Sequence, residues 1–140
     1  MSGALTGRCL CGAVSYELAT RPSGMDVCHC GMCRKFGGAF GLNVLAGGIS
    51  WQGAENIRIY VSSEWAERGF CGICGSSLFY RMTEPAYLSL SAGTLDDANG
   101  IPLTTEVFID DKPDGYDLAG DHRRMTGAEV IAAFGGDRAP

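Results

Sequence analysis

Seven cysteines are the residues of this sequence with the clearest chemical capability. An odd number of cysteines cannot all pair as disulfides, and the start of the chain lacks the basic and apolar regions of a signal peptide. We therefore expect a cytoplasmic protein with reduced thiols, for which clustered cysteines are typical of metal binding. They form three groups, with none standing alone: Cys9 and Cys11; Cys28, Cys30 and Cys33; Cys71 and Cys74.

Cys71 and Cys74 have the two-residue spacing that lets a tight turn direct both sulfurs at one ion. A closed tetrahedral zinc site needs two further ligands, and Cys9 with Cys11 is the only other group of two. Residues i and i+2 of a strand point to the same face, so we expect these two sulfurs to converge from a strand. The four cysteines together predict a structural zinc that joins the beginning of the chain to its middle, and whose loss would unfold the domain.

The remaining three cysteines, Cys28, Cys30 and Cys33, form a triplet within six residues. Catalytic zinc sites characteristically have three protein ligands and an open position, whereas structural sites are saturated. The sequence therefore predicts a second, catalytic zinc. The alternative is a second closed site completed by His29, His122 or Asp26, although His29 would point away from its neighbours on an extended chain. For Cys71 and Cys74, the alternative is a redox-active pair.

Two basic residues, Arg34 and Lys35, directly follow the triplet. We expect one of them to bind a carboxylate of the substrate, because a cation beside a metal site is well placed to hold an anionic group. The alternative is a solvated pair of surface charges.

Short runs of alternating apolar residues predict half-buried strands, and turn-forming segments separate them. We expect a mainly antiparallel β fold with one short C-terminal helix, in which Thr126 and Glu129 have capping-box spacing and an apolar stripe runs to Phe134. The alternating runs are Val14, Tyr16 and Leu18; Ile57, Ile59 and Val61; Leu78 and Tyr80; Leu88 and Leu90; Val107 and Ile109.

Composition narrows the functional classes. The 140 residues suit one domain, and no apolar stretch approaches the roughly 20 residues of a membrane span. The net charge of -5 disfavours binding to nucleic acid or to anionic membranes. The oligomeric state cannot be read from the sequence.

Three ordered motifs carry a family resemblance. They are Gly7-x-Cys9-x-Cys11-Gly12-x-Val14-x-Tyr16, Cys28-His29-Cys30-x-x-Cys33-Arg34-Lys35 and Phe70-Cys71-x-x-Cys74-Gly75-Ser76-x-Leu78. Together they resemble the glutathione-dependent formaldehyde-activating enzyme family, which includes centromere protein V. The likeness predicts a zinc-binding β domain over residues 5–118, with residues 119–140 as a C-terminal segment of the same unit.

The resemblance implies a folded-over arrangement of sheets known as a β-tent. It also implies a structural zinc on Cys9, Cys11, Cys71 and Cys74 and a catalytic zinc on Cys28, Cys30 and Cys33, in agreement with the count of ligands. The family prototype joins glutathione to formaldehyde to give S-hydroxymethylglutathione, which is a carbon–sulfur lyase reaction in reverse. We therefore expect a zinc enzyme that joins a small thiol to a small aldehyde, with glutathione as the co-substrate. The alternatives are a non-catalytic zinc-stabilised binding module and a thiol redox or zinc-buffering protein.

Overall fold

The chain divides by its internal contacts into two compact units. A computed structural model describes residues 5–83 and 86–133. The first unit comprises Met1–Ser23 and Asn43–Ile101, and the second comprises Gly24–Leu42 and Pro102–Pro140. The four cysteines predicted to bind the structural zinc all belong to the first unit, and the triplet belongs to the second.

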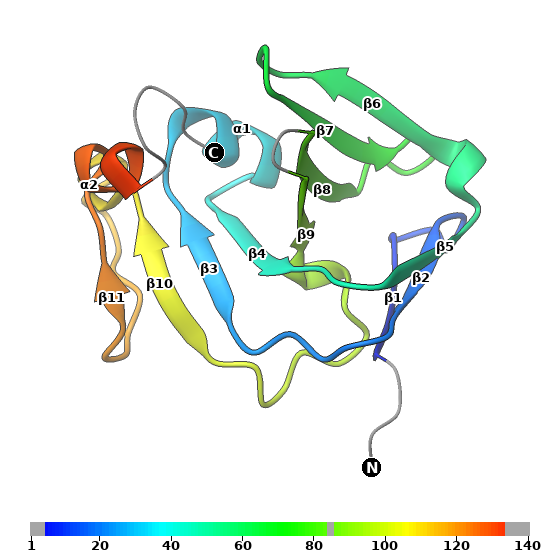
Figure 1. Ribbon diagram of the computed structural model, residues 1–140, viewed down its shortest axis with the longest axis horizontal. Helices are drawn as coiled ribbons and strands as arrows, with labels where there is room; N and C mark the ends of the chain where they lie inside the picture. Colours follow the sequence, from blue (N-terminus) through cyan, green and yellow to red (C-terminus); the bar gives the residue numbers. More distant parts are fainter. Residues whose placement is uncertain (1–4, 84–85, 134–140) are drawn as a thin grey trace. The chain divides into compact units, whose positions relative to one another are not determined.

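The first unit contains two antiparallel sheets (Figure 1). One sheet has the order β1-β2-β5, with β1 at Leu5–Arg8, β2 at Ser15–Leu18 and β5 at Ile49–Gln52. In the other, β4 (from Asn43 onward), β9, β8, β7 and β6 follow one another. Their bounds are Gly41–Leu45, Tyr87–Ser91, Ser77–Met82, Ala66–Cys71 and Ile57–Val61. The short helices η1 (Ala54–Asn56) and η2 (Ala92–Thr94) connect strands.

Aromatic side chains join these two sheets. The ring of Trp51 lies 5.5 Å from that of Tyr16 and 5.7 Å from that of Phe79, measured between centroids. Phe79 in turn crosses Gly69 on the neighbouring strand so closely that a Cβ at Gly69 would lie 2.3 Å from the ring. Only glycine fits there, because any side chain would collide with a ring that is itself fully buried.

The second unit is built on three parallel strands (Figure 1). Strand β10 (Leu103–Val107) lies between β3 (Met25–Cys28) and β11 (Arg123–Arg124). In this register Val107 is opposite Cys28, and Glu106 is opposite Arg124. The end of β3, where the triplet begins, is therefore fixed against the end of β10.

Three short helices complete this unit. They are α1 (Gly31–Gly37), η3 (Ile109–Asp111) and α2 (Gly127–Ala133). The capping box at the start of α2 is present, because the Thr126 amide donates to Glu129 Oε1 at 2.8 Å and the Glu129 amide donates to Thr126 Oγ1 at 3.2 Å. Those contacts account for the lowered pKa of the Glu129 carboxyl, which the Thr126 amide and hydroxyl stabilise as the anion.

The structure confirms a mainly β protein with antiparallel sheets and a short C-terminal helix. Each predicted alternating run overlaps a strand, although Val14 lies just before β2 and Ile109 lies beyond the end of β10. Phe134 lies outside the described residues. The prediction of a half-buried strand was wrong for β6, where Ile59 and Val61 are 43% and 66% exposed, because β6 is the last strand of its sheet. The parallel pairing of β3, β10 and β11 was not predicted.

Among the described residues, neither α-helix exceeds seven residues, and none has the length and apolar character needed to cross a membrane.

Candidate metal centres

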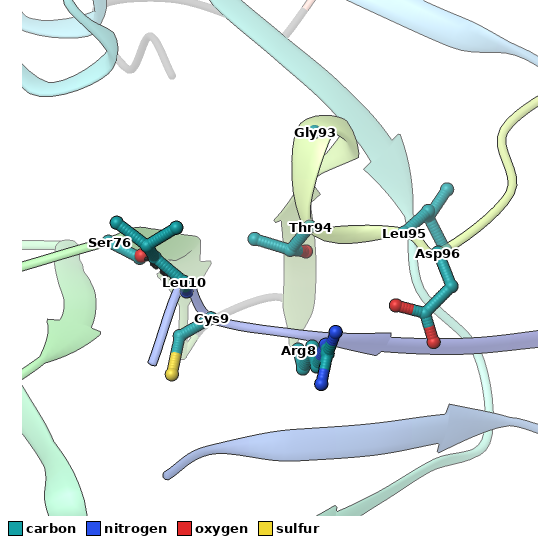
Figure 2. Close-up of a pocket in the computed structure, with 8 residues that line it drawn as sticks. All are labelled: Arg8, Cys9, Leu10, Ser76, Gly93, Thr94, Leu95 and Asp96. Carbon is teal, nitrogen blue, oxygen red and sulfur yellow. Dashed lines mark hydrogen bonds between the residues drawn. The ribbon is translucent and has the colours of Figure 1, made fainter. Parts of the chain in front are cut away.

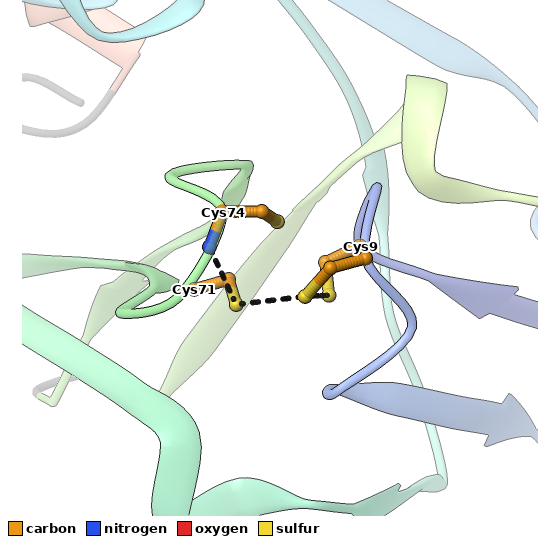
Figure 3. Close-up of side chains that lie close together, drawn as sticks. Cys9, Cys71 and Cys74 are labelled. Carbon is orange, nitrogen blue, oxygen red and sulfur yellow. Dashed lines mark hydrogen bonds between the residues drawn. The ribbon is translucent and has the colours of Figure 1, made fainter.

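The first centre lies in the first unit, where two turns face each other (Figure 3). Cys9 and Cys11 come from the turn between β1 and β2, whereas Cys71 is the last residue of β7 and Cys74 lies in the turn between β7 and β8. Their four sulfurs all lie within 4.8 Å of one another. The Sγ–Sγ distances are 3.7 Å for Cys9 to Cys11 and 3.8 Å for Cys11 to Cys71. A tetrahedral zinc with Zn–S bonds of about 2.3 Å requires sulfurs about 3.8 Å apart, so this group fits zinc.

The expectation that Cys9 and Cys11 converge from a strand was wrong. Strand β1 ends at Arg8, and the two sulfurs are brought together by a turn in which the Gly12 amide donates to the Cys9 carbonyl at 3.1 Å. The second turn is closed in the same way, since the Gly75 amide donates to the Cys71 carbonyl at 2.9 Å. Gly12 and Gly75 follow the last cysteine of each turn and have φ values of 82° and 81°, a left-handed conformation that glycine adopts without strain.

Backbone and hydroxyl donors surround the sulfurs of this first group. The amide of Val14 donates to Cys9 Sγ at 3.3 Å, and that of Ile73 donates to Cys71 Sγ at 3.4 Å. A hydrogen bond with the Ser76 hydroxyl is the main cause that lowers the pKa of the Cys74 thiol to about 5. At Cys9 and Cys74, whose thiol pKa values are lowered, such donors favour the thiolate, which is the form that binds metal.

An open groove adjoins this group (Figure 2). Its volume is about 400 Å³. The Leu10 amide donates to Ser76 Oγ at 2.9 Å across the two turns, and Thr6 Oγ1 donates to Asp96 Oδ2 at 2.7 Å nearby. None of the three cysteines of the second group contributes to the groove. It is lined by Arg8, Cys9, Leu10, Ser76, Gly93, Thr94, Leu95 and Asp96.

The second centre lies in the second unit, where the three sulfurs of Cys28, Cys30 and Cys33 also lie within 4.8 Å of one another. Cys28 is the last residue of β3, Cys30 is the N-cap of α1 and Cys33 lies in the first turn of that helix. The Cys30 sulfur accepts the Cys33 amide at 3.4 Å, as an N-cap side chain does. The segment therefore folds so that a strand end and a helix start present three sulfurs to one point.

This second group is deeply buried. The exposed fractions are 5% for Cys28, 9% for Cys30 and 6% for Cys33, and Val107 and Phe108 pack against the group. Phe108 has a φ of 55°, which is rare for a bulky residue and costs about 1–2 kcal/mol. Its ring covers Gly127, where a Cβ would lie 2.8 Å from it. The fold thus maintains a strained residue as an apolar wall beside the three sulfurs.

The contacts between the sulfurs of the triplet give its thiols different pKa values. Hydrogen bonding to Cys28 and then to Cys33 lowers the pKa of Cys30, whereas hydrogen bonding to Cys30 and then to Cys33 raises the pKa of Cys28. Cys30 therefore binds a proton weakly and Cys28 binds one strongly. A metal cation would compete with the proton on Cys28.

Among the described residues, the triplet has no fourth protein ligand, which disfavours the alternative of a second closed site. His29 and His122 instead both bond to Glu106, at 2.7 Å and 2.5 Å. Asp26 lies beside Thr104, whose hydroxyl donates to it at 3.4 Å, and burial raises the pKa of its carboxyl. Sequence reasoning missed Glu106, because nothing in its neighbourhood along the chain marks it.

Arg34 and Lys35 belong to the last turn of α1. Arg34 is partly buried and its Nε donates to the His29 carbonyl at 3.2 Å, while Lys35 is exposed. A substrate-binding role for either stays a prediction.

Comparisons with known proteins agree with these two groups. The sequence matches the family described as "Glutathione-dependent formaldehyde-activating enzyme" over residues 4–111, a span that includes all seven cysteines. The chain belongs to this family. Among its relatives, an uncharacterised lyase of Schizosaccharomyces pombe is 33% identical over 132 residues, which cover 91% of this chain and 95% of that protein.

Among solved structures, a crystal structure of a Rhodobacter sphaeroides protein is similar to this chain. Its TM-score is 0.57 at 26% identity, and the match covers 71% of this chain and 99% of that one. The likeness shows that the two chains share a fold over the matched part.

Proposed function

We propose that this chain is a zinc-dependent lyase-type enzyme acting on the carbon–sulfur bond between a thiol and a small aldehyde, of which glutathione and formaldehyde are the first candidates. Family membership and a relative named as a lyase support the reaction class. The observation that carries the proposal is the convergence of three buried sulfurs with no fourth ligand among the described residues.

In this proposal the two cysteine groups have different tasks. Cys9, Cys11, Cys71 and Cys74 hold a structural zinc, since four thiolates saturate a tetrahedral ion. Cys28, Cys30 and Cys33 hold a catalytic zinc, which when bound would supply an open position for a substrate thiol and favour its thiolate form at neutral pH.

The reaction is balanced without an oxidant or reductant. A carbon–sulfur bond forms between the thiol and the carbonyl carbon, the carbonyl π electrons move to oxygen, and the thiol proton ends on that oxygen. The reverse direction breaks the same bond. Val107 and Phe108 contribute by covering the triplet with apolar surface, which limits competing access of water.

Arg34 and Lys35 would bind a carboxylate of the thiol substrate. Arg34 keeps its Nε engaged with the His29 carbonyl, so its terminal nitrogens are the ones that would meet the substrate. Lys35 is exposed and carries a mobile charge one residue further along α1.

Zinc per chain tests the proposal first, measured on protein purified without chelator from zinc-replete cells and repeated for Cys30→Ser. Serine is itself a good N-cap, so this change removes a ligand while leaving the start of α1 capped. We expect two zincs to fall to about one with the fold retained. Exchange between free and glutathione-bound formaldehyde, followed by NMR, should be accelerated by the wild type and not by the variant.

One zinc in both proteins would show that the triplet binds none and would refute the proposal. Two zincs without accelerated exchange of any thiol and aldehyde would leave a binding module as the better interpretation.

A further inference from the structure

The second unit contains a buried carboxylate with three donors. Glu106 is 1% exposed, and its Oε1 accepts His29 Nε2 at 2.7 Å. Its Oε2 accepts His122 Nε2 at 2.5 Å and Arg124 Nε at 3.1 Å. Burial raises the pKa of Glu106, but the hydrogen bonds from His122 and His29 outweigh that effect and hold the pKa below its usual value. A buried carboxylate with such partners is a fixed anchor point.

His29 connects this anchor to the triplet, because it is the residue between Cys28 and Cys30. Its side chain is 0% exposed and bonded to Glu106, its amide donates to the Val107 carbonyl at 3.1 Å, and its carbonyl accepts Arg34 Nε. The residue is thus held by β10 on one side and by α1 on the other. Any rotation of its backbone would move both adjoining sulfurs.

The Glu106 contact is what orients the imidazole ring. Nδ1 is buried and has no hydrogen-bond partner among the residues that the structure describes. The ring also packs against the rings of Phe40 and Tyr116, whose centroids lie 5.8 Å and 6.4 Å away. Aromatic packing allows several ring rotations, whereas the hydrogen bond from Nε2 selects one.

Glu106 is itself held from the opposite side. Arg124 lies opposite it in the pairing of β10 with β11, and the terminal nitrogen Nη2 of Arg124 donates to the carbonyls of Leu118 and Gly120 at 3.0 Å and 3.1 Å. His122, whose side chain is 4% exposed, comes from the same segment. Residues 118–124 therefore fix the carboxylate that fixes His29.

We propose that Glu106 is a positioning residue for the three-cysteine site, acting through His29 to hold Cys28 and Cys30 in the geometry that binds metal. The inference rests on the proposed function, which assigns a metal to that site. Hydrogen bonds in the second shell of a metal site normally orient a ligand directly, and their loss typically costs about 10- to 100-fold in affinity. In this protein the hydrogen bond orients His29, which lies between Cys28 and Cys30, and it thereby acts on both of these ligands indirectly.

The test compares Glu106→Gln with Glu67→Gln. Glu67 pairs with Arg81 in the first unit, so the control removes a partnered carboxylate of equal charge that belongs to the other unit. Zinc affinity of the three-cysteine site is measured by competition with a chromophoric chelator, and Co²⁺ substitution gives a spectrum for each site. We expect Glu106→Gln to weaken the triplet about 10-fold or more and to shift its Co²⁺ bands, and the control to change neither.

Two further variants separate positioning from general stability. His29→Gln retains an amide donor for Glu106 and should keep most of the affinity, whereas His29→Leu has no donor and should lose it. His122→Gln leaves the contact between Glu106 and His29 in place and should cost less than Glu106→Gln.

Equal metal affinities in Glu106→Gln and wild type would overturn the inference, and so would loss of both metals together, which would mark Glu106 as a core residue. These results leave the proposed function standing if wild-type protein binds two zincs and turns over. A wild type that binds only one zinc would overturn both.

Discussion

The two cysteine groups of this protein are shaped by different means. The four-cysteine group is partly exposed to solvent at Cys11 and Cys74. Its geometry comes from two backbone turns, each of which ends in a glycine. The three-cysteine group is buried and adjoins the network centred on Glu106. A site that only has to stay closed can rely on local turns. A site with an open position lacks one ligand, and other contacts must hold the remaining three.

The largest expected difference between the groups is in stability. Cys71→Ser removes a ligand that links two turns 60 residues apart, and we expect a loss of more than about 4 kcal/mol in the free energy of unfolding. Cys30→Ser should lower the free energy of unfolding far less, because the three cysteines of its group all lie within one short segment. Urea unfolding followed by circular dichroism, with zinc content measured in parallel, gives both values. Equal losses would contradict the division into structural and open sites.

A chelator should remove the two zinc ions at different rates. With three protein ligands, the triplet is expected to release zinc to EDTA at least about 10-fold faster than the four-cysteine group, because one coordination position is open to attack by the chelator. Zinc release is followed with a metal-sensitive dye. The protein should keep its strand signal in circular dichroism after the first zinc leaves and lose it with the second. The reverse order would exchange the proposed roles.

Substrate selectivity distinguishes Arg34 and Lys35 from ordinary surface charges. If they hold a carboxylate, Arg34→Ala combined with Lys35→Ala should raise KM for glutathione about 10-fold, which corresponds to about 1.4 kcal/mol. The KM for 2-mercaptoethanol, which has no carboxylate, should not change. Similar KM changes for both thiols would show that the pair acts on the fold of α1 instead.

The glycines are expected to affect stability less than the zinc ligand Cys71 does. Gly75→Ala places a side chain at a φ of 81° and should cost about 1–2 kcal/mol, although a Cβ there would meet no atom within 4 Å. Gly37→Ala has equally open surroundings but lies in α1 with an ordinary φ, and should be neutral or stabilising by up to about 1 kcal/mol. Thermal melting of the zinc-loaded variants checks the contrast. An equal change in both would show that backbone strain does not shape the turn.

Much of the candidate site could be predicted from the sequence, because ligand type and spacing are local properties. The pair Cys71 and Cys74 and the segment from Cys28 to Cys33 each fold within a few residues, so local structure already brings their sulfurs near one another. The capping box of α2 was predictable for the same reason. The mode of convergence of Cys9 and Cys11 was not, since a turn and a strand can both bring two sulfurs together.

Long-range pairing set the limits of prediction. The exposure of β6 depends on its place at the end of a sheet, which no property of Ile59 or Val61 records. Glu106 looks like an ordinary charged residue of a strand, yet it is buried because its partners arrive from residues 16 to 77 positions away.

The sequence by itself determined the number of cysteines that could bind metal, their division into four and three, and a mainly β fold of a known family. The tertiary structure decided what surrounds the three-cysteine site: parallel pairing of β3 with β10 places Glu106 within reach of His29, and pairing of β10 with β11 supplies His122 and Arg124. The physical reason is that thiolate spacing is a local property of the chain, whereas a buried carboxylate is stable only where donors from distant segments meet it.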